Sequence, residues 1–299
     1  MNYKVFQLLK LGKERLLKSK LPEIEARFLM EFLLKKSFTE LINCYQDDVD
    51  ESIVEKYHDL IQKRLTGIPL QHITNEQYFY GNSYYVNEHV LIPRPETEML
   101  VDSGIEYITQ RFHKGKRHFR VVDMCTGSGC IALSIGNYFA NEASKFQDID
   151  LEILGVDISK EALKVARMNS NNIYHNNSVC FVESDLFKNV TWSDIDLFLS
   201  NPPYITPDEI NNLSSEVKDY EPILALDGGN DGLEFYRLIS SESFDKLGED
   251  SMIIYEIGHG QMTDVIKILE DCNYKGVNGK MDFQNLERLV YGIKLNKPD

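Results

Sequence analysis

Short apolar runs alternate with helical stretches from about residue 119 onward, and this alternation restricts the fold more than any other feature of the chain. Each run is rich in Val, Ile, Leu and Phe and has the length of a buried strand. Strands separated by helices form a mostly parallel sheet that helices cover on both faces. The sequence therefore predicts an α/β fold. The expected strands are residues 119–123, 151–157, 179–182, 195–200, 252–257 and 288–293.

The N-terminal part of the chain has a helical pattern instead. Residues 25–34 combine good helix formers with apolar side chains about 3.6 positions apart, and residues 52–65 predict a second helix that ends before Gly67 and Pro69. Two β-prone runs around the dipeptide Gly-Asn at 81–82 then predict a hairpin. The expected domains are a small helical domain over residues 1–75, a β-hairpin linker over 76–92 and the α/β domain over 93–299.

Charge and composition argue against several classes of function. The chain is 42% hydrophobic and 26% charged, as soluble globular proteins are, and no apolar stretch approaches the roughly 18 residues of a membrane span. Residues 1–75 contain 12 Lys or Arg and 11 Asp or Glu, whereas residues 76–299 contain 20 and 36. The acidic larger part should repel a phosphate backbone. We therefore expect a cytoplasmic protein that binds neither DNA nor a membrane.

The five cysteines predict free thiols rather than disulfides. They are odd in number and include no Cys-x-x-Cys pair. This pattern favours mostly buried thiols in a reducing compartment, and we expect no metal site.

The sequence Asn201-Pro202-Pro203-Tyr204 directly follows the expected strand 195–200. A double proline cannot continue a strand, so the backbone leaves the sheet in a rigid conformation. Because proline has no N–H, this corner presents two acceptors, the Asn201 side-chain oxygen and the Pro202 carbonyl, beside the flat ring of Tyr204. Such a corner suits a planar NH2 group, either a carboxamide or the exocyclic amine of a base. The alternative is an Asn-Pro turn on the surface.

A glycine-rich loop joins the first expected strand to a helix that includes Ile131. Glycines let the backbone approach a ligand closely, at the carboxyl edge of the sheet where such folds bind ligands. Gly127, Gly129 and Ala132 also fit the dinucleotide fingerprint, and a plain tight turn is a further alternative. The loop residues expected to bind a cofactor are Asp123, Cys125, Thr126, Gly127, Ser128 and Gly129.

Residues at successive strand ends narrow the choice of cofactor. The Asp123 carboxylate repels a pyrophosphate but suits a cationic ligand such as S-adenosylmethionine. The Asp157 carboxylate can accept hydrogen bonds from two ribose hydroxyls, as in NAD sites, and its alternative role as a cap of the helix 160–169 can coexist with this one. After the third strand, Asp185 is expected to bind the adenine amine and Leu186 to pack on the ring. Together these residues predict a nucleoside site beside an amide site.

A class I methyltransferase loop followed by Asn-Pro-Pro-Tyr resembles the amino-methyltransferases that modify amide or amine nitrogens. Within that group the chain is similar to the HemK-type release-factor glutamine N5-methyltransferases, over residues 65–295. Residues 94–98 separate it from the related ribosomal-protein glutamine methyltransferases. It departs from the family at Cys125, where glycine is usual, and at Leu186, where an aromatic residue can occur. The further segments that carry the resemblance are 66–73, 91–98, 221–226 and 282–288.

The resemblance implies a Rossmann-like class I methyltransferase sheet with covering helices. The implied methyl donor is S-adenosylmethionine, with S-adenosylhomocysteine as the product. The implied substrate is the glutamine of the Gly-Gly-Gln loop of bacterial-type peptide-chain release factors, whose body the helical domain would hold. We expect the protein to act as a monomer.

The resemblance also assigns roles to the site residues. Asn201 and the Pro202 carbonyl would each accept one amide N–H, while Tyr204 would pack against the amide plane. Arg94 would brace the cofactor or the substrate loop, and a salt bridge of the extended, proline-rich connector 91–96 is the alternative. Besides the loop residues, those implied to contact the cofactor are Asp157, Asp185, Leu186, Asn201 and Arg94, and those implied to contact the substrate are Asn201, Pro202, Pro203 and Tyr204.

Two other functions compete with this one. A DNA adenine or cytosine N-methyltransferase shares Asn-Pro-Pro-Tyr and flips a base out of the duplex. It needs a basic groove or an added recognition domain, and neither is visible in the sequence. A methyltransferase fold that docks on a translation factor without turnover is the other competitor, but the intact cofactor and amide motifs argue against it.

Overall fold

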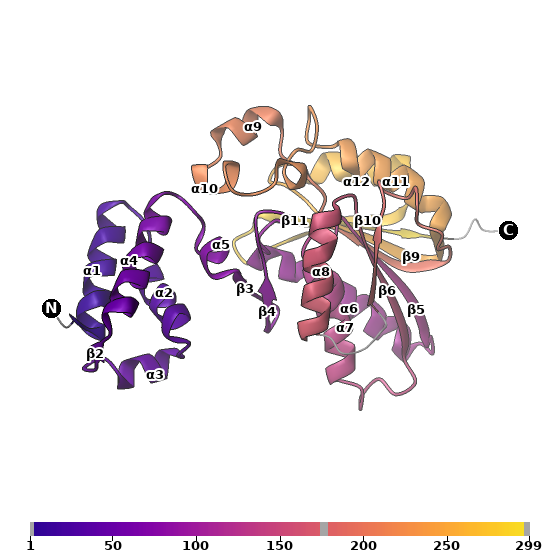
Figure 1. The fold of residues 1–299 in the computed structure, drawn as a ribbon. Coiled ribbons are helices and arrows are strands. Elements are labelled where there is room, and N and C mark those ends of the chain that lie inside the picture. The colour runs from indigo at the N-terminus through magenta and orange to yellow at the C-terminus, as the bar shows by residue number, and fades with distance from the viewer. Residues whose placement is uncertain (1–2, 174–178, 296–299) are drawn as a thin grey trace. The chain divides into compact units, whose positions relative to one another are not determined.

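The computed structural model describes residues 3–173 and 179–295 of the chain (Figure 1). The chain divides into two compact units. The first comprises Met1–Glu76 and Ser214–Tyr220, and the second comprises Gln77–Leu213 and Glu221–Asp299. The segment expected to be helical thus falls in the first unit, together with a short segment that the sequence analysis assigns to the α/β domain. Among the described residues, no helix is long and apolar enough to cross a membrane.

The first unit is a set of short helices around an apolar core. Leu8, Leu29, Tyr57 and Ile61 are fully buried in it. One predicted helix has the expected bounds, and the other begins one residue earlier than expected. The elements are β1 (Tyr3–Lys4), α1 (Val5–Lys18), α2 (Glu25–Leu34), α3 (Phe38–Asn43), β2 (Asp48–Val49), α4 (Glu51–Leu65), α5 (Leu70–Thr74) and α10 (Ser215–Lys218).

A buried arginine joins α10 to the rest of this unit. The Arg64 side chain is 2% exposed, and its guanidinium lies 2.5 Å from Glu25 Oε2 and 3.0 Å from Glu216 Oε1. The Tyr220 hydroxyl donates a hydrogen bond to the Thr66 carbonyl at 3.1 Å. These contacts explain why residues of this segment belong to the helical unit although they follow the Asn-Pro-Pro-Tyr sequence in the chain.

The second unit is built on a seven-stranded sheet with the order β10-β11-β9-β8-β5-β6-β7. Strands β5 to β9 pair in parallel with one another, and β11 is antiparallel to both its neighbours. The predicted α/β fold is therefore confirmed. The strands are β5 (His118–Met124), β6 (Asp150–Asp157), β7 (Val179–Glu183), β8 (Ile195–Ser200), β9 (Leu247–Glu256), β10 (Lys275–Met281) and β11 (Glu287–Lys294), and a separate hairpin is formed by β3 (Glu76–Phe79) and β4 (Asn82–Tyr85).

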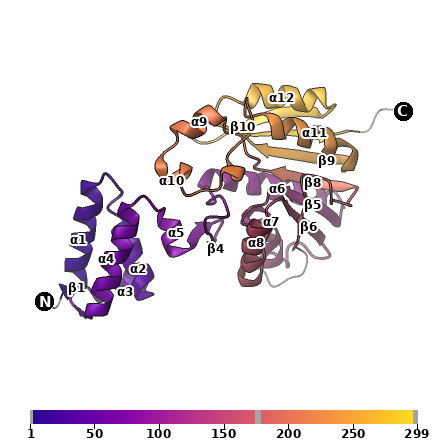
Figure 2. The same ribbon diagram turned by 45° about the horizontal axis from the view of Figure 1, so that its top comes forward.

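Helices cover both faces of this sheet, as Figure 2 shows. On one face, Ile105 of α6 and Leu133 of α7 pack with Val121 of β5. On the other, Ile239 of α11 and Val265 of α12 pack with strand residues of the opposite pleat. The helices of this unit are α6 (Glu98–His113), α7 (Cys130–Asn141), α8 (Lys160–Ile173), α9 (Pro207–Asn212), α11 (Glu234–Lys246) and α12 (Met262–Asp271), with single 3-10 turns η1 (Pro95–Thr97) and η2 (Ile223–Ala225).

The sequence does not predict β10, and its burial explains the omission. None of its residues is buried, and it forms the edge of the sheet. An edge strand with one partner needs no continuous apolar run, because solvent reaches its outer side. Hydrophobic patterning therefore cannot reveal it.

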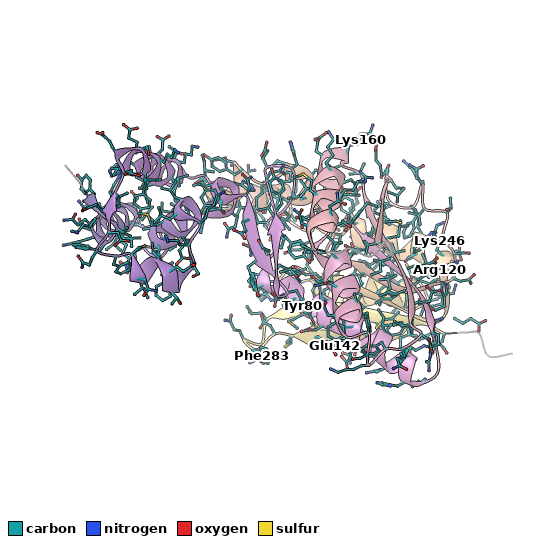
Figure 3. All side chains as sticks on the ribbon, turned by 60° about the horizontal axis from the view of Figure 1, so that its bottom comes forward. Tyr80, Arg120, Glu142, Lys160, Lys246 and Phe283 are labelled. Atoms are coloured by element: carbon teal, nitrogen blue, oxygen red, sulfur yellow. The ribbon has the colours of Figure 1, made fainter. Side chains whose placement is uncertain are left out.

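The hairpin turn lies one residue earlier than predicted. Its central residues are Tyr80 and Gly81, with φ of 45° and 78°, as a type I′ turn requires. Tyr80 (Figure 3) is held in this conformation because its N–H donates to Glu98 Oε1 at 2.8 Å and its hydroxyl donates to Asp102 Oδ1 at 2.7 Å. Tertiary hydrogen bonds from α6 thus fix the turn position.

All five cysteines are free thiols, as predicted. Their burial varies more than expected. Cys44 and Cys130 are buried, Cys125 and Cys272 are half-buried, and Cys180 is exposed.

We expect Gly12→Ala to destabilise the protein by up to about 2 kcal/mol, the difference between an overpacking cost of about 1–3 kcal/mol and the gain in helix propensity. An added Cβ at Gly12 would lie 2.3 Å from the Tyr57 hydroxyl oxygen, and such overpacking outweighs the gain of about 1 kcal/mol in helix propensity. Urea denaturation measures the change. In a Tyr57→Phe background the closest atom is gone, so the same glycine substitution should be less harmful there. An equal loss in both backgrounds would contradict this explanation.

Candidate functional site

The carboxyl ends of β5, β6, β7 and β8 border a cavity of about 200 Å³, and all its lining residues belong to the second unit. From β5 the chain continues to β6 and β7 on one side, whereas β8 and β9 lie on the other. Ligands of open α/β sheets bind at such a switch in strand order. The expected site residues that line the cavity are Arg94, Cys125, Thr126, Gly127, Ser128, Asp157, Asp185, Leu186, Asn201 and Pro203, whereas Asp123, Gly129, Pro202 and Tyr204 are not part of its wall.

The glycines of the loop after β5 have different surroundings. Gly127 has φ of 54°, and a Cβ added there would meet no atom within 4 Å. Gly129 has φ of 80°, and an added Cβ would lie 3.2 Å from the side chains of Ala166 and Phe181. Gly127 therefore leaves open space beside the cavity, while Gly129 allows α7 to pack closely on α8 and β7.

The backbone conformation at Cys125 explains why glycine is usual at this position in the family that the sequence resembles. Its φ of 64° lies in the left-handed region, which costs an L-residue about 1–2 kcal/mol relative to glycine. Burial raises the pKa of its thiol well above the ordinary value, so the sulfur is a neutral thiol at physiological pH. Cys125 contributes an apolar wall rather than a nucleophile.

Asp123 lies beneath the loop. Its Oδ2 atom accepts hydrogen bonds from the Thr126 hydroxyl at 2.5 Å and from the Ala132 N–H at 3.2 Å. Its Oδ1 atom has no partner among the described residues. Full burial, together with the nearby charge of Asp157, raises the pKa of Asp123 to about 7. Asp123 therefore fixes the loop conformation, and its contact with a cofactor stays a prediction.

Asp157 connects the end of β6 to the same loop. Its Oδ2 accepts from the Gly127 N–H and its Oδ1 accepts from the Ser159 N–H, each at 2.9 Å. The α8 helix is capped by Ser159, whose hydroxyl oxygen accepts from the Ala162 N–H at 3.1 Å, so the alternative role of Asp157 as the cap is wrong. Each oxygen can accept a second hydrogen bond from the cavity side. Burial raises the pKa of Asp157.

Of three further expected residues that line the cavity, Asp185 and Arg94 form ion pairs and Leu186 has a left-handed backbone. Asp185 Oδ2 lies 2.5 Å from Lys188 Nζ, and Leu186 has φ of 47°. Arg94 lies 2.5 Å from the buried carboxylate of Glu221. Arg94 therefore forms a salt bridge, as the alternative role supposes, but with a partner outside the segment 91–96, and Arg94 also lines the cavity.

The Asn-Pro-Pro-Tyr corner leaves β8 and is held in place from two sides. Asn201 Nδ2 donates to Thr97 Oγ1 at 3.4 Å, and the Tyr204 carbonyl accepts from Gln261 Nε2 at 3.1 Å. A Cβ added at Gly228 would lie 2.5 Å from Tyr204 Cα, so only glycine permits this approach. The backbone that carries the two expected acceptors is therefore rigid.

Comparison with known proteins agrees with this geometry. Residues 7–74 match the family described as the PrmC N-terminal domain, and residues 97–217 match the methyltransferase small domain. The release factor glutamine methyltransferase of Clostridium acetobutylicum is 37% identical over 90% of this chain and 90% of its own length. That of Bacillus cereus is 33% identical over 96% and 98%. The chain belongs to the release factor glutamine methyltransferase family.

A solved structure supports the fold independently. The hMettl16 catalytic domain, crystallised in complex with MAT2A 3′UTR hairpin 6, superposes with a TM-score of 0.56 at 15% identity, covering 81% of this chain and 84% of that one. At this identity the likeness concerns the fold alone.

Asn169 and Glu256 also help to build this site, although the sequence analysis did not identify them. Fully buried Asn169 donates to the Ser128 carbonyl at 2.9 Å and accepts from the Tyr85 N–H at 2.7 Å. Its position in the apolar stripe of α8 is the signal, since a polar residue there needs buried partners. Glu256 ends β9 beside Asn201, whereas the predicted strand continues to residue 257. The available signal is therefore a charged residue within an apolar run.

We expect the stability gained by Asp123→Asn to grow as the pH rises. The pKa of Asp123 is about 7 in the folded protein and about 3.9 in an unfolded chain. Between these values the unfolded state loses the proton first, so this group destabilises the fold progressively as the pH rises from about 4 to 7. Thermal denaturation at pH 5 and pH 8 measures the difference. Asp208→Asn, at an exposed position in α9, is the control, and an equal pH trend in both variants would contradict the assignment.

Proposed function

We propose that this protein methylates the side-chain amide nitrogen, N5, of the glutamine in the Gly-Gly-Gln loop of peptide-chain release factors, with S-adenosylmethionine as the methyl donor. The observation that carries the proposal is the position of Asn201 on the same cavity as Gly127 and Asp157. An amide-binding corner and strand ends suited to a nucleoside thus meet in one site. Membership of the release factor glutamine methyltransferase family supports the same activity.

The residues around the cavity fit S-adenosylmethionine. Gly127 leaves room for close backbone approach, and both Asp157 oxygens retain acceptor capacity for ribose hydroxyls. Leu186 lines the cavity beside Asp185, where an adenine ring would find an apolar wall and a polar partner. The buried carboxyls suit a cationic ligand. When bound, S-adenosylmethionine supplies a methyl group on a sulfonium sulfur and leaves as S-adenosylhomocysteine.

An amide nitrogen is a poor nucleophile because its lone pair is delocalised into the carbonyl. The Asn-Pro-Pro-Tyr corner is proposed to compensate for this by orienting the amide. Asn201 Oδ1 and the Pro202 carbonyl each accept one N–H of the substrate amide, which aligns the nitrogen with the methyl group. The same two oxygens stabilise the positive charge that develops on the nitrogen. Because the backbone here is fixed by Gly228 and Gln261, this alignment is preorganised.

Proton transfer needs no strong base at this corner. The N–H becomes acidic as the new C–N bond forms, and a water takes the proton. Tyr204 is not the base, because burial raises the pKa of its phenol to about 12 and keeps it protonated at neutral pH. Its ring is proposed to pack against the amide plane next to Pro203, which lines the cavity, although Tyr204 itself is not among the lining residues.

The helical unit is the surface proposed to hold the body of the release factor. Its match to the PrmC N-terminal domain supports this role. The Arg94–Glu221 ion pair lies at the cavity rim and braces the connector there. We further propose that the protein acts as a monomer in the cytoplasm.

We expect labelled methyl from S-adenosylmethionine to appear on a purified release factor, and not on its Gly-Gly-Gln glutamine→Ala variant or on duplex DNA. Asn201→Ala should lower kcat roughly 10²- to 10³-fold, because it removes one preorganised acceptor, while the variant still folds, as its circular dichroism spectrum would show. Scintillation counting after gel separation measures the transfer. Label on DNA, or on both forms of the factor, would refute the substrate assignment.

Gly127→Ala should weaken S-adenosylmethionine binding at least about 10-fold, because the new methyl group enters the space that the ligand needs. Gly276→Ala is the matched control. Gly276 also has positive φ, 58°, and open space around it, so both substitutions carry a similar strain of about 1–2 kcal/mol. Isothermal titration calorimetry measures affinity and thermal denaturation measures stability. Equal affinities of the two variants would show that Gly127 does not contact the cofactor.

A further inference from the structure

Glu256 is a buried carboxyl group at the end of β9, beside the corner that carries Asn201. The parallel register pairs Ser200 of β8 with Tyr255 of β9, so Asn201 and Glu256 follow at adjoining strand ends. Glu256 is 4% exposed, and it is not part of the cavity wall. It therefore reaches the site only through its neighbours.

Those neighbours are the side chains of Thr97 and Asn201. Burial raises the pKa of Glu256, while hydrogen bonding from Thr97 and Asn201 opposes this rise, so both neighbours favour its charged form. Asn201 Nδ2 also donates to Thr97 Oγ1 at 3.4 Å. Thr97 is 3% exposed, so the three side chains form a buried network with Asn201 at its cavity end.

The chemistry of this network decides which way the Asn201 amide faces. A carboxylate can only accept hydrogen bonds, whereas a carboxamide has an oxygen acceptor at one end and an NH2 donor at the other. The two orientations have nearly the same shape, so packing alone does not separate them. With Glu256 ionised, Nδ2 is required on the buried side and Oδ1 is left for the cavity.

We propose that Glu256 is a positioning residue that fixes the carboxamide of Asn201 with Oδ1, rather than Nδ2, toward the methyl-accepting amide. This inference deepens the proposed function and rests on it. In the reversed orientation, the Asn201 NH2 would face an N–H of the substrate, and two donors would meet without an acceptor between them.

A purely structural role does not explain this carboxyl group. Its Oε2 atom has no hydrogen-bond partner among the described residues. Arg288, the cation that acts on Glu256 electrostatically, pairs instead with Asp282 at 2.8 Å and with Glu96 at 3.6 Å. Desolvation by burial raises the pKa of Glu256 to about 7, so the charged form is unfavourable for folding. Glutamine has the same shape without this burden.

The test compares Glu256→Gln with wild type at pH 8. A glutamine at this position can donate to Asn201 Oδ1 as well as accept from Nδ2, so it no longer selects one orientation. We expect kcat to fall roughly 10- to 100-fold, with the Kd for S-adenosylmethionine within about 2-fold and with no loss of thermal stability. Glu96→Gln is the matched control, because it removes a charge near Arg288 without touching the amide network.

The pH dependence gives a second readout that a structural role would not produce. Below the pKa of Glu256 its protonated form also donates, so the difference between wild type and Glu256→Gln should shrink as the pH falls from 8 to 6. The other titratable or charged groups acting on Glu256 are Glu96 of η1, Arg288 of β11, Tyr204 of the corner, Tyr236 of α11 and Cys130 of α7. Asp123 titrates in the same range, and the ratio to the variant removes its contribution.

A third readout does not depend on activity. In ¹⁵N-labelled protein, NMR contacts between the Asn201 side-chain NH2 and the Thr97 methyl group should be present in wild type and weakened in Glu256→Gln. Wild-type kcat in the variant, or unchanged NMR contacts, would overturn the proposal. If the wild-type protein fails to label a release factor, the proposed substrate is wrong, and the NMR comparison still decides whether Glu256 orients Asn201.

Discussion

The parallel pairing of β8 with β5 on one side and β9 on the other is the constraint on which the site depends. It brings three strand ends to one edge of the sheet, and β6 adds a fourth on the far side of β5. A cavity forms there because the chain turns away in opposite directions from β5 and β8. The loop after β5, Asp157, the Asn-Pro-Pro-Tyr corner and Glu256 all derive their positions from this register.

The same edge concentrates buried acidic groups. Burial raises the pKa of Asp123, Asp157 and Glu256, and the charge of Asp157 acts on Asp123. Each is held by backbone or side-chain donors, yet Asp123 and Glu256 retain one oxygen without a partner among the described residues. Such groups weaken the fold and persist at functional sites. A cationic ligand would offset part of this electrostatic burden, which is consistent with a sulfonium donor at this cavity.

Sequence patterns anticipate the parts of the molecule that are decided locally. The bounds of β8 and α2 follow from apolar runs and spacing, because their burial is continuous or periodic. Sequence patterns do not predict structural features that depend on burial in the fold or on contacts with residues far away in the chain. β10 is an exposed edge without an apolar signal, Tyr80 is fixed in its turn by α6, and residues 214–220 join the helical unit through Arg64. The position of a residue at a strand end indicates that it can belong to the site, but not whether it lines the cavity. Asp123 lies beneath the loop after β5 and is not part of the cavity wall.

The two acceptors at the corner differ in one physical respect. The Pro202 carbonyl is part of a backbone that Gly228 and Gln261 hold from outside, so it cannot exchange its acceptor for a donor. The Asn201 carboxamide can do so by a half-turn about its terminal bond, with almost no change in shape. A site that recognises an NH2 group through this side chain therefore needs a third group to remove the ambiguity. An acceptor-only side chain on the neighbouring strand, out of reach of the substrate, is the simplest device that does so, and Glu256 occupies that place.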